Sequence, residues 1–203
     1  MSTNEAFDAV TADTSPAEVN PVVEPAEDLT PCTETAGPIV VLVGLPGAGK
    51  STIGRRLARA LNTELVDSDE LIEKSYGKAC GQIFTELGEP AFREVEAVQV
   101  AEALKSTGVV SLGGGAVLTE STRELLKHHE VVWIDVPVEE GIRRTIGERT
   151  RPVLQAADPV QHYRNLVEKR TPLYEEVASY RLRTKDRSPQ QVVAAVLHHI
   201  ENH

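Results

Sequence analysis

The sequence predicts an α/β domain in which a parallel sheet is covered by helices on both faces. Short runs rich in β-branched residues alternate with stretches that have helical spacing of apolar residues. Most of the strand-like runs are mainly apolar, which is typical of strands buried on both faces. A glycine-rich loop joins the first such run to the first helical stretch. Folds of this class bind their ligands at the carboxyl ends of the strands.

Five runs are predicted to be strands, and three stretches are predicted to be helices. The strands are residues 39–43, 65–67, 109–112, 131–136 and, with a weaker pattern, 180–184. The helices are residues 50–61, residues 89–104 with Pro90 in the first turn, and residues 188–200 with Ser188 as the cap before Pro189. Because the apolar pattern is continuous from residue 39 to residue 200, we expect one folded domain over residues 38–203.

The first 37 residues differ from the rest in composition. They contain eight Asp or Glu, four Pro and no Lys or Arg, whereas the remaining residues contain 23 acidic and 21 basic side chains. Such a segment buries too little apolar surface to offset the entropy lost on ordering. We therefore predict a disordered acidic extension over residues 1–37, with a role as a docking segment left open. The net charge of −10 comes mostly from this extension.

Several classes of protein do not fit the composition. No run approaches the ~18 apolar residues of a membrane span, and no basic region precedes an apolar stretch as in a secretory signal. Cys32 and Cys80 lack disulfide or metal-site spacing. An acidic chain without a basic stripe is a poor nucleic-acid binder. We expect a cytoplasmic protein that binds neither membranes nor nucleic acid.

The segment GLPGAGKS, residues 44–51, matches the phosphate-binding pattern G-x-x-x-x-G-K-[ST]. Glycines let backbone N–H groups surround phosphate oxygens, and the following helix N-terminus adds positive potential. Lys50 is placed to reach the β- and γ-phosphates, and the Ser51 hydroxyl to ligate Mg²⁺. The alternative is a flexible strand-to-helix turn. The predicted ATP-binding residues of this segment are Gly47, Ala48, Gly49, Lys50, Ser51 and Thr52.

Two carboxylates follow the second predicted strand. Asp67 and Asp69 are spaced i, i+2, which puts both on one side of an extended chain. One is suited to hold Mg²⁺ through water, and the other to orient or deprotonate an attacking hydroxyl. The alternative for Asp69 is that it caps the helix that follows.

Two further features lie in the middle of the chain. Arg93 and Glu96 share a helix face, and a guanidinium held by a carboxylate is pre-aimed for a bidentate grip on a substrate carboxylate. The alternative is an ordinary surface salt bridge. The glycines 113–115 end the third predicted strand, where they allow a ligand to approach the backbone.

Together these motifs resemble the shikimate kinases, small P-loop kinases of aromatic amino acid biosynthesis. The resemblance covers about residues 38–200. It rests on GLPGAGKSTIGRRLA, DSD at 67–69, FREVE at 92–96, SLGGGAV, TRPVL at 150–154 and KRTPLY at 169–174. It implies a three-layer P-loop kinase fold of the nucleoside monophosphate kinase type, with a central five-stranded parallel sheet and a lid at about residues 148–160. It also implies a reaction in which ATP phosphorylates the 3-hydroxyl of shikimate to give shikimate 3-phosphate and ADP.

On the substrate side, the resemblance implies that Asp69 meets the ring hydroxyls and serves as the candidate base. Arg93 and Arg170 would clamp the carboxylate of shikimate. Gly114 would touch the substrate through its backbone, with Gly115 beside it.

On the nucleotide side, the resemblance implies that Asp67 supports Mg²⁺ beside Ser51. Arg151 would close over the phosphates from the lid and would complete the catalytic set with Lys50 and Asp69. The remaining nucleotide contacts would be Arg144 and Pro189, which flank adenine, and Arg187. A monomer is expected. Two alternatives stay open: a P-loop kinase for another small hydroxylated metabolite, and an ATP-binding sensor without catalysis.

Overall fold

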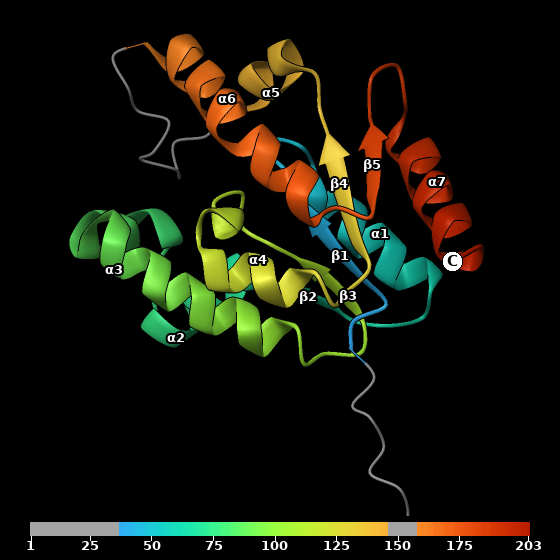
Figure 1. The fold of residues 1–203 in the computed structure, drawn as a ribbon, viewed down its shortest axis with the longest axis horizontal. Coiled ribbons are helices and arrows are strands. Elements are labelled where there is room, and N and C mark those ends of the chain that lie inside the picture. Colours follow the sequence, from blue (N-terminus) through green and yellow to red (C-terminus); the bar gives the residue numbers. More distant parts are fainter. Residues whose placement is uncertain (1–36, 146–157) are drawn as a thin grey trace, which may run out of the picture. The chain divides into compact units, whose positions relative to one another are not determined.

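A five-stranded parallel sheet forms the centre of the folded part of the chain (Figure 1). The computed structural model describes residues 37–145 and 158–203. The strands are β1 (Val40–Val43), β2 (Leu65–Asp67), β3 (Val109–Ser111), β4 (Val131–Asp135) and β5 (Tyr180–Arg183). They pair in the order β2-β3-β1-β4-β5. The predicted α/β class and parallel sheet are confirmed, with each strand end within one residue of its predicted limit.

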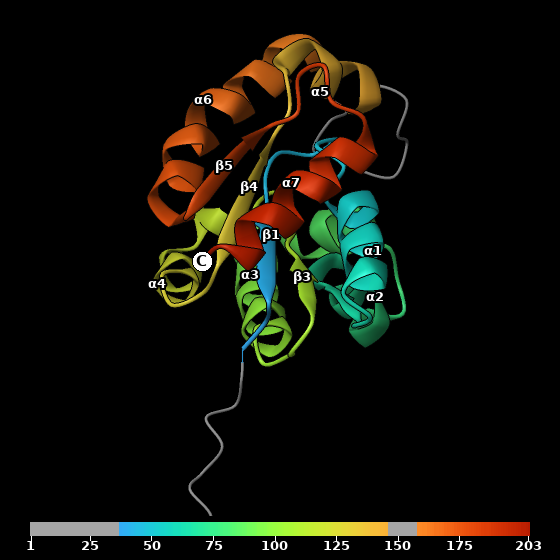
Figure 2. The same cartoon turned by 90° about the vertical axis from the view of Figure 1, so that its right-hand side faces the viewer.

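Helices cover both faces of this sheet. Val40 and Leu42 of β1 pack on one face with side chains of α1 and α7, and Val41 and Val43 pack on the other with side chains of α3, α4 and α6. Figure 2 shows α1 and α7 on the near side of the strands. The helices are α1 (Lys50–Ala60), α2 (Ser68–Tyr76), α3 (Cys80–Ala103), η1 (Ala116–Leu118, a 3₁₀ turn), α4 (Glu120–Leu126), α5 (Val138–Thr145), α6 (Pro159–Val177) and α7 (Pro189–Glu201).

Two predicted helix starts are confirmed by their local geometry. The Ser188 side chain accepts a hydrogen bond from the Gln191 N–H, and the Gln191 side chain accepts one from the Ser188 N–H, which forms a capping box for α7. In α3, Gly88 has φ 76° and ψ 163°, a conformation that only glycine adopts readily. The helical run therefore restarts at Glu89, as predicted, although the turns before Gly88 were not expected.

Three helices, α4, α5 and α6, were not predicted. Helix α6 is the least expected because Pro172 lies inside it, and an internal proline removes a backbone donor and clashes with the preceding turn. Its buried residues recur every three or four positions, so packing of one face outweighs the local cost. They are Tyr163, Leu166, Arg170, Tyr174 and Val177.

The carboxyl ends of β1, β2 and β3 lie level with one another. Ser111 pairs with Leu42 on one side and with Asp67 on the other. The loop after β1, the start of α2 and the glycines after β3 therefore leave the sheet at the same edge, close to where the strand order reverses and open parallel sheets bind ligands.

Some sequence predictions fall outside the described residues. These are the acidic extension up to residue 36, Arg151, and the lid as far as residue 157. Within residues 37–145 and 158–203, none of the helices is both long enough and apolar enough to cross a membrane.

Candidate active site

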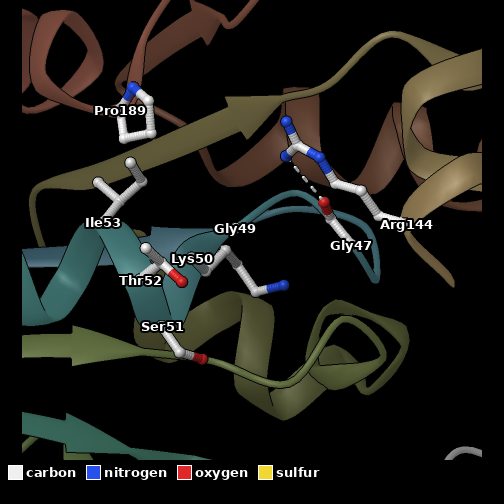
Figure 3. Close-up of a pocket in the computed structure, with 8 residues that line it drawn as sticks. All are labelled: Gly47, Gly49, Lys50, Ser51, Thr52, Ile53, Arg144 and Pro189. Carbon is white, nitrogen blue, oxygen red and sulfur yellow. Dashed lines mark hydrogen bonds between the residues drawn. The ribbon is translucent and has the colours of Figure 1, made fainter. Parts of the chain in front are cut away.

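The loop between β1 and α1 is held in shape by side chains from three helices. The carbonyl oxygens of residues 44–47 each accept a side-chain hydrogen bond. Lys50 Nζ donates to the first two at 2.8 and 3.2 Å, and the Tyr163 hydroxyl donates to the third at 3.0 Å. Arg144 Nη1 donates to the fourth at 3.2 Å (Figure 3). Side chains of α1, α5 and α6 therefore orient the peptide planes of this phosphate loop.

A cavity of about 540 Å³ lies against this loop and the start of α1. Its volume is in the range of ligand-binding clefts. Figure 3 shows residues from three places in the chain around it: the phosphate loop, α5 and the start of α7. The lining residues are Gly47, Gly49, Lys50, Ser51, Thr52, Ile53, Arg144 and Pro189. All but Ile53 were assigned to ATP from the sequence, whereas the assigned Ala48 is buried in the core beneath the loop.

Arg187, the remaining residue assigned to the nucleotide in the described part of the chain, lines a neighbouring cavity of about 270 Å³. Arg144 lines both cavities, so the two adjoin at its side chain. Arg144 also donates from Nε to Glu140 at 2.8 Å, which directs its guanidinium toward the loop.

The pair assigned to Mg²⁺ is brought together. The Ser51 hydroxyl donates to Asp67 Oδ2 at 2.7 Å, and Asp67 Oδ1 accepts the N–H of Asp69 at 3.0 Å. Asp67 is therefore the N-cap of α2. The alternative in which Asp69 is the cap is wrong, because the extended backbone at Asp67 places its own carboxylate over the first turn of the helix.

Arg93 and Glu96 form a buried ion pair. Arg93 Nη1 lies 2.6 Å from Glu96 Oε2, and the Glu96 side chain is 3% exposed. The alternative of an ordinary surface salt bridge is therefore wrong for this pair. Burial raises the pKa of the Glu96 carboxyl, and the adjacent Arg93 guanidinium opposes that rise in part. Arg93 Nη2 also contacts Glu89 Oε1 at 3.2 Å, so carboxylates hold the guanidinium on two sides.

Two of the three consecutive glycines make room for this cluster. A methyl group at Gly113 would lie 2.5 Å from Asp69 Oδ1 and 2.9 Å from Glu96 Oε1. A methyl group at Gly115 would overlap the Arg93 guanidinium. The glycine loop, residues 113–115, thus brings Asp69, Glu96 and Arg93 against one stretch of backbone.

The middle residue of the glycine loop connects this cluster to Arg170. Arg170 Nη1 donates to the Gly114 carbonyl at 2.9 Å, and the Tyr174 hydroxyl donates to the same oxygen at 2.6 Å. Arg170 is 4% exposed. Its burial lowers the pKa of the guanidinium, and the positive charge of Arg93 acts in the same direction.

The two arginines assigned to a substrate carboxylate share one further property. The Nε atoms of Arg93 and Arg170 are buried, and neither has a hydrogen-bond partner among the described residues. A buried donor without an acceptor is costly in a folded protein. Because Gly115 lies against one guanidinium and Gly114 accepts from the other, both arginines contact the same short loop. They suit an anion that supplies the missing acceptors.

Four residues of the site were missed by sequence reasoning: Ser68, Glu89, Tyr163 and Tyr174. The Ser68 hydroxyl accepts the Gly113 N–H at 2.9 Å and so connects the start of α2 to the glycine loop. Ser68 and Tyr174 are part of the motifs DSD and KRTPLY, and their presence in these motifs was the available signal. Nothing in the pattern around Tyr163 distinguishes it from an ordinary core tyrosine.

Gly115→Ala is expected to raise the KM for the substrate whose carboxylate Arg93 is predicted to bind, while leaving the fold intact. The new methyl group displaces the flexible end of Arg93 rather than backbone. We expect about a tenfold rise, in the range for loss of one charged hydrogen bond. Steady-state kinetics on this variant, on Arg93→Lys and on the double variant check the mechanism. Additive effects of the two substitutions would contradict it, because both act on the same guanidinium.

Comparison with known proteins agrees with this geometry. The family model described as "Shikimate kinase" matches residues 46–201, more than half of the chain. The chain belongs to the shikimate kinase family. It is 85% identical over 164 residues to the shikimate kinase of Corynebacterium glutamicum, a match that covers 81% of this chain and 97% of that protein. It is 77% identical over 167 residues to the enzyme of Corynebacterium efficiens, covering 82% of this chain and 99% of that one.

A solved shikimate kinase has the same fold. The structure from Acinetobacter baumannii, in complex with shikimate, has a TM-score of 0.78 and 38% sequence identity, and the match covers 83% of this chain and 95% of that chain. The resemblance stated from the motifs is confirmed, as is the prediction of an ATP-dependent kinase.

Proposed function

We propose that this shikimate kinase family member transfers the γ-phosphoryl group of ATP to the 3-hydroxyl of shikimate. The observation that carries the proposal is that the phosphate loop and two arginines lie at one edge of one sheet. The buried Nε donors of these arginines have no partner among the described residues. The phosphate loop suits a triphosphate, and the arginine pair suits a carboxylate on the acceptor molecule. The family and the shikimate-bound relative support shikimate as that acceptor.

On the acceptor side, Arg93 and Arg170 bind the carboxylate of shikimate. Their charges and forked donors hold the ring so that one hydroxyl faces Asp69. Asp69 orients that hydroxyl and accepts its proton as the oxygen attacks phosphorus. The backbone of Gly114 and Gly115 forms the surface on which the ring rests.

On the nucleotide side, the N–H groups of residues 47–52 surround the phosphates. Lys50 Nζ, which donates to carbonyls of the loop in the absence of a ligand, turns to the stronger acceptors that the β- and γ-phosphates supply. Arg151, outside the described residues, is proposed to close over the phosphates from the lid. The residues proposed to contact the adenosine part are Arg144, Arg187 and Pro189.

The Ser51 and Asp67 oxygens fit a magnesium ion. A hydroxyl and a carboxylate 2.7 Å apart beside the phosphate cavity form the kind of oxygen pair that magnesium uses together with water and substrate phosphates. When bound, the ion neutralises charge on the phosphates. We assign Ser51 to direct ligation and Asp67 to contact through water.

Catalysis in this arrangement is positioning together with charge stabilisation. Phosphoryl transfer passes through a loose transition state with charge spread over the γ-oxygens. Lys50 and Arg151 hold that charge, while Asp69 and the arginine pair fix the attacking hydroxyl in line. Closure of the proposed lid, about residues 148–160, excludes water, which would otherwise accept the phosphoryl group.

The proposal is tested by a coupled ADP-release assay with and without shikimate. We expect release that depends on shikimate, with little in its absence. Release at the same rate without shikimate, or only with another hydroxylated metabolite such as gluconate, would refute it. Nucleotide binding without turnover under any of these conditions would instead indicate a sensor.

Three further parts of the proposal concern the oligomeric state, the location and partners, and the first 37 residues. We propose that the chain acts as a monomer in the cytoplasm, away from membranes and nucleic acid, and that residues 1–37 form a disordered acidic extension beside the kinase domain at 38–203. Size-exclusion chromatography with light scattering tests the first part. For the acidic extension, we expect a chain that lacks residues 1–37 to retain full activity.

Arg93→Lys is expected to raise the KM for shikimate while changing kcat much less. A lysine supplies one point charge in place of a planar fork, at a cost of about 1.5–3 kcal/mol for a charged hydrogen bond. That cost corresponds to roughly 10- to 150-fold in KM. The kinetics of Arg55→Lys, an exposed arginine on α1 that pairs with Glu70, provide the control. An unchanged KM in Arg93→Lys would remove Arg93 from the carboxylate site.

A further inference from the structure

One face of α6 reaches both loops of the site. Tyr163, Arg170 and Tyr174 are spaced by seven and four residues, so they share a helix face. The Tyr163 hydroxyl donates to the Pro46 carbonyl at 3.0 Å in the phosphate loop. Arg170 and Tyr174 donate to the Gly114 carbonyl in the glycine loop. A single rigid element is therefore bonded to the nucleotide side and to the acceptor side.

The two loops also touch each other directly. A methyl group at Gly114 would lie 2.9 Å from Pro46 Cδ, 3.1 Å from Pro46 N and 3.2 Å from the Gly44 carbonyl oxygen. There is no room for a side chain, so the backbones are in contact. A shift of the phosphate loop at Pro46 is passed to Gly114 and, through its carbonyl, to Arg170.

Tyr163 differs from the other side chains that hold the phosphate loop. Lys50 and Arg144 line the nucleotide cavity and are proposed to bind ATP, so they exchange partners during turnover. Tyr163 is 1% exposed, and its hydroxyl occupies space that Gly141 leaves open, because a methyl group there would overlap it. Burial raises the pKa of Tyr163 to about 12, so the phenol stays a donor at working pH.

We propose that Tyr163 is a positioning residue that couples nucleotide binding to shikimate binding. By holding Pro46 it keeps the phosphate loop in contact with Gly114, so that ordering of one loop by its ligand orders the other. The coupling is reciprocal, because each ligand changes the affinity of the other by the same factor. This inference rests on the proposed function, since it needs both ligands to bind at this edge of the sheet.

Calorimetric titration of shikimate, with and without saturating ADP and magnesium, tests the coupling. In the wild-type protein we expect ADP to tighten shikimate binding about fivefold or more. In Tyr163→Phe we expect the factor to fall to about two or less, while the Kd for shikimate alone changes less than about twofold and kcat falls roughly two- to tenfold. Tyr180→Phe is the matched control, because that hydroxyl makes no hydrogen bond to the described residues.

The outcomes separate this inference from the proposed function. Shikimate-dependent ADP release in the wild type comes first, and its absence would refute the proposed function. Wild-type turnover with a coupling factor near one, or with full coupling kept in Tyr163→Phe, would overturn the role of Tyr163. Should Tyr163→Phe fail to fold in a thermal melt, amide hydrogen exchange of the wild-type protein with and without ADP and magnesium is the second test. Slower exchange in the glycine loop when only the nucleotide is bound supports the inference, and unchanged exchange there overturns it.

Discussion

Asp69→Asn is expected to lower kcat for shikimate phosphorylation by roughly 10²- to 10⁴-fold, the range of a general base. The amide keeps the shape of the side chain and can still hydrogen-bond to ring hydroxyls. It cannot accept a proton at working pH, so the attacking oxygen is no longer activated. The KM for shikimate is therefore expected to change far less than kcat.

The position of Asp69 keeps the effect of this substitution separate from folding. The N-cap of α2 is Asp67, so changing Asp69 removes no cap. The Asp69 Oδ1 atom lies against Gly113, where an amide of the same size fits. A melting temperature within a few degrees of wild type is expected, because asparagine keeps the shape of the side chain and the loss of one first-turn charge is a small effect.

The matched control for this prediction is Glu70→Gln, which removes the neighbouring first-turn charge from α2. Glu70 is exposed and pairs with Arg55 at 3.3 Å, away from the glycine loop. We expect its kcat to stay at the wild-type value. Turnover of Asp69→Asn within about tenfold of wild type would mean that Asp69 positions shikimate without acting as a base.

The sequence predicted the sheet well because its strands carry a strong local signal. Three of the five strands are buried on both faces and mainly apolar, a pattern that predicts a parallel strand covered by helices. Helix starts were also predictable where special residues enforce them, as Gly88 with Pro90 does in α3 and Ser188 does in α7. Helix α6 has a comparable start signal, with Asp158 as its N-cap before Pro159, but the prediction did not use it. Pro172 inside the helix argues against helix formation, and the contacts that stabilise α6 come from distant loops.

The site residues that belong to sequence motifs were predictable. Residues at the ends of β1, β2 and β3 come together because parallel strands end at one edge, so Ser51 meets Asp67 as expected. The sequence left open whether Asp69 caps α2 and did not predict Asp67 as the cap, because the answer depends on the backbone angles at Asp67. Tyr163 could not be found at all, since nothing in the polar stretch around it shows whether its hydroxyl bonds to a distant loop.

Arg170→Met is expected to raise the KM for shikimate about 30-fold or more, the effect of leaving a buried charged group without its partner. In this variant the carboxylate of shikimate faces Arg93 alone. The structure makes the cause specific to binding, because the Gly114 carbonyl keeps its hydrogen bond from the Tyr174 hydroxyl when Arg170 is removed. Steady-state kinetics with shikimate varied at saturating ATP measure the change.

The same substitution is expected to leave the fold as stable as wild type or more stable. Arg170 is a buried cation whose Nε lacks a partner among the described residues and whose pKa is lowered by burial, so its charge is poorly compensated before a ligand binds. Removing a poorly compensated buried charge is often neutral or stabilising, and in this variant Glu96 keeps Arg93 as its ion-pair partner. A site kept at the expense of stability is the usual sign of function.

Arg164→Met is the control for both parts of this prediction, because Arg164 lies on the exposed face of the same helix. We expect its KM to match the wild type. A KM for Arg170→Met within about threefold of wild type would contradict the carboxylate role, since even one charged hydrogen bond is worth more. A large fall in melting temperature together with a raised KM would show instead that Arg170 holds the glycine loop in place, and that the loss of affinity follows from a displaced loop.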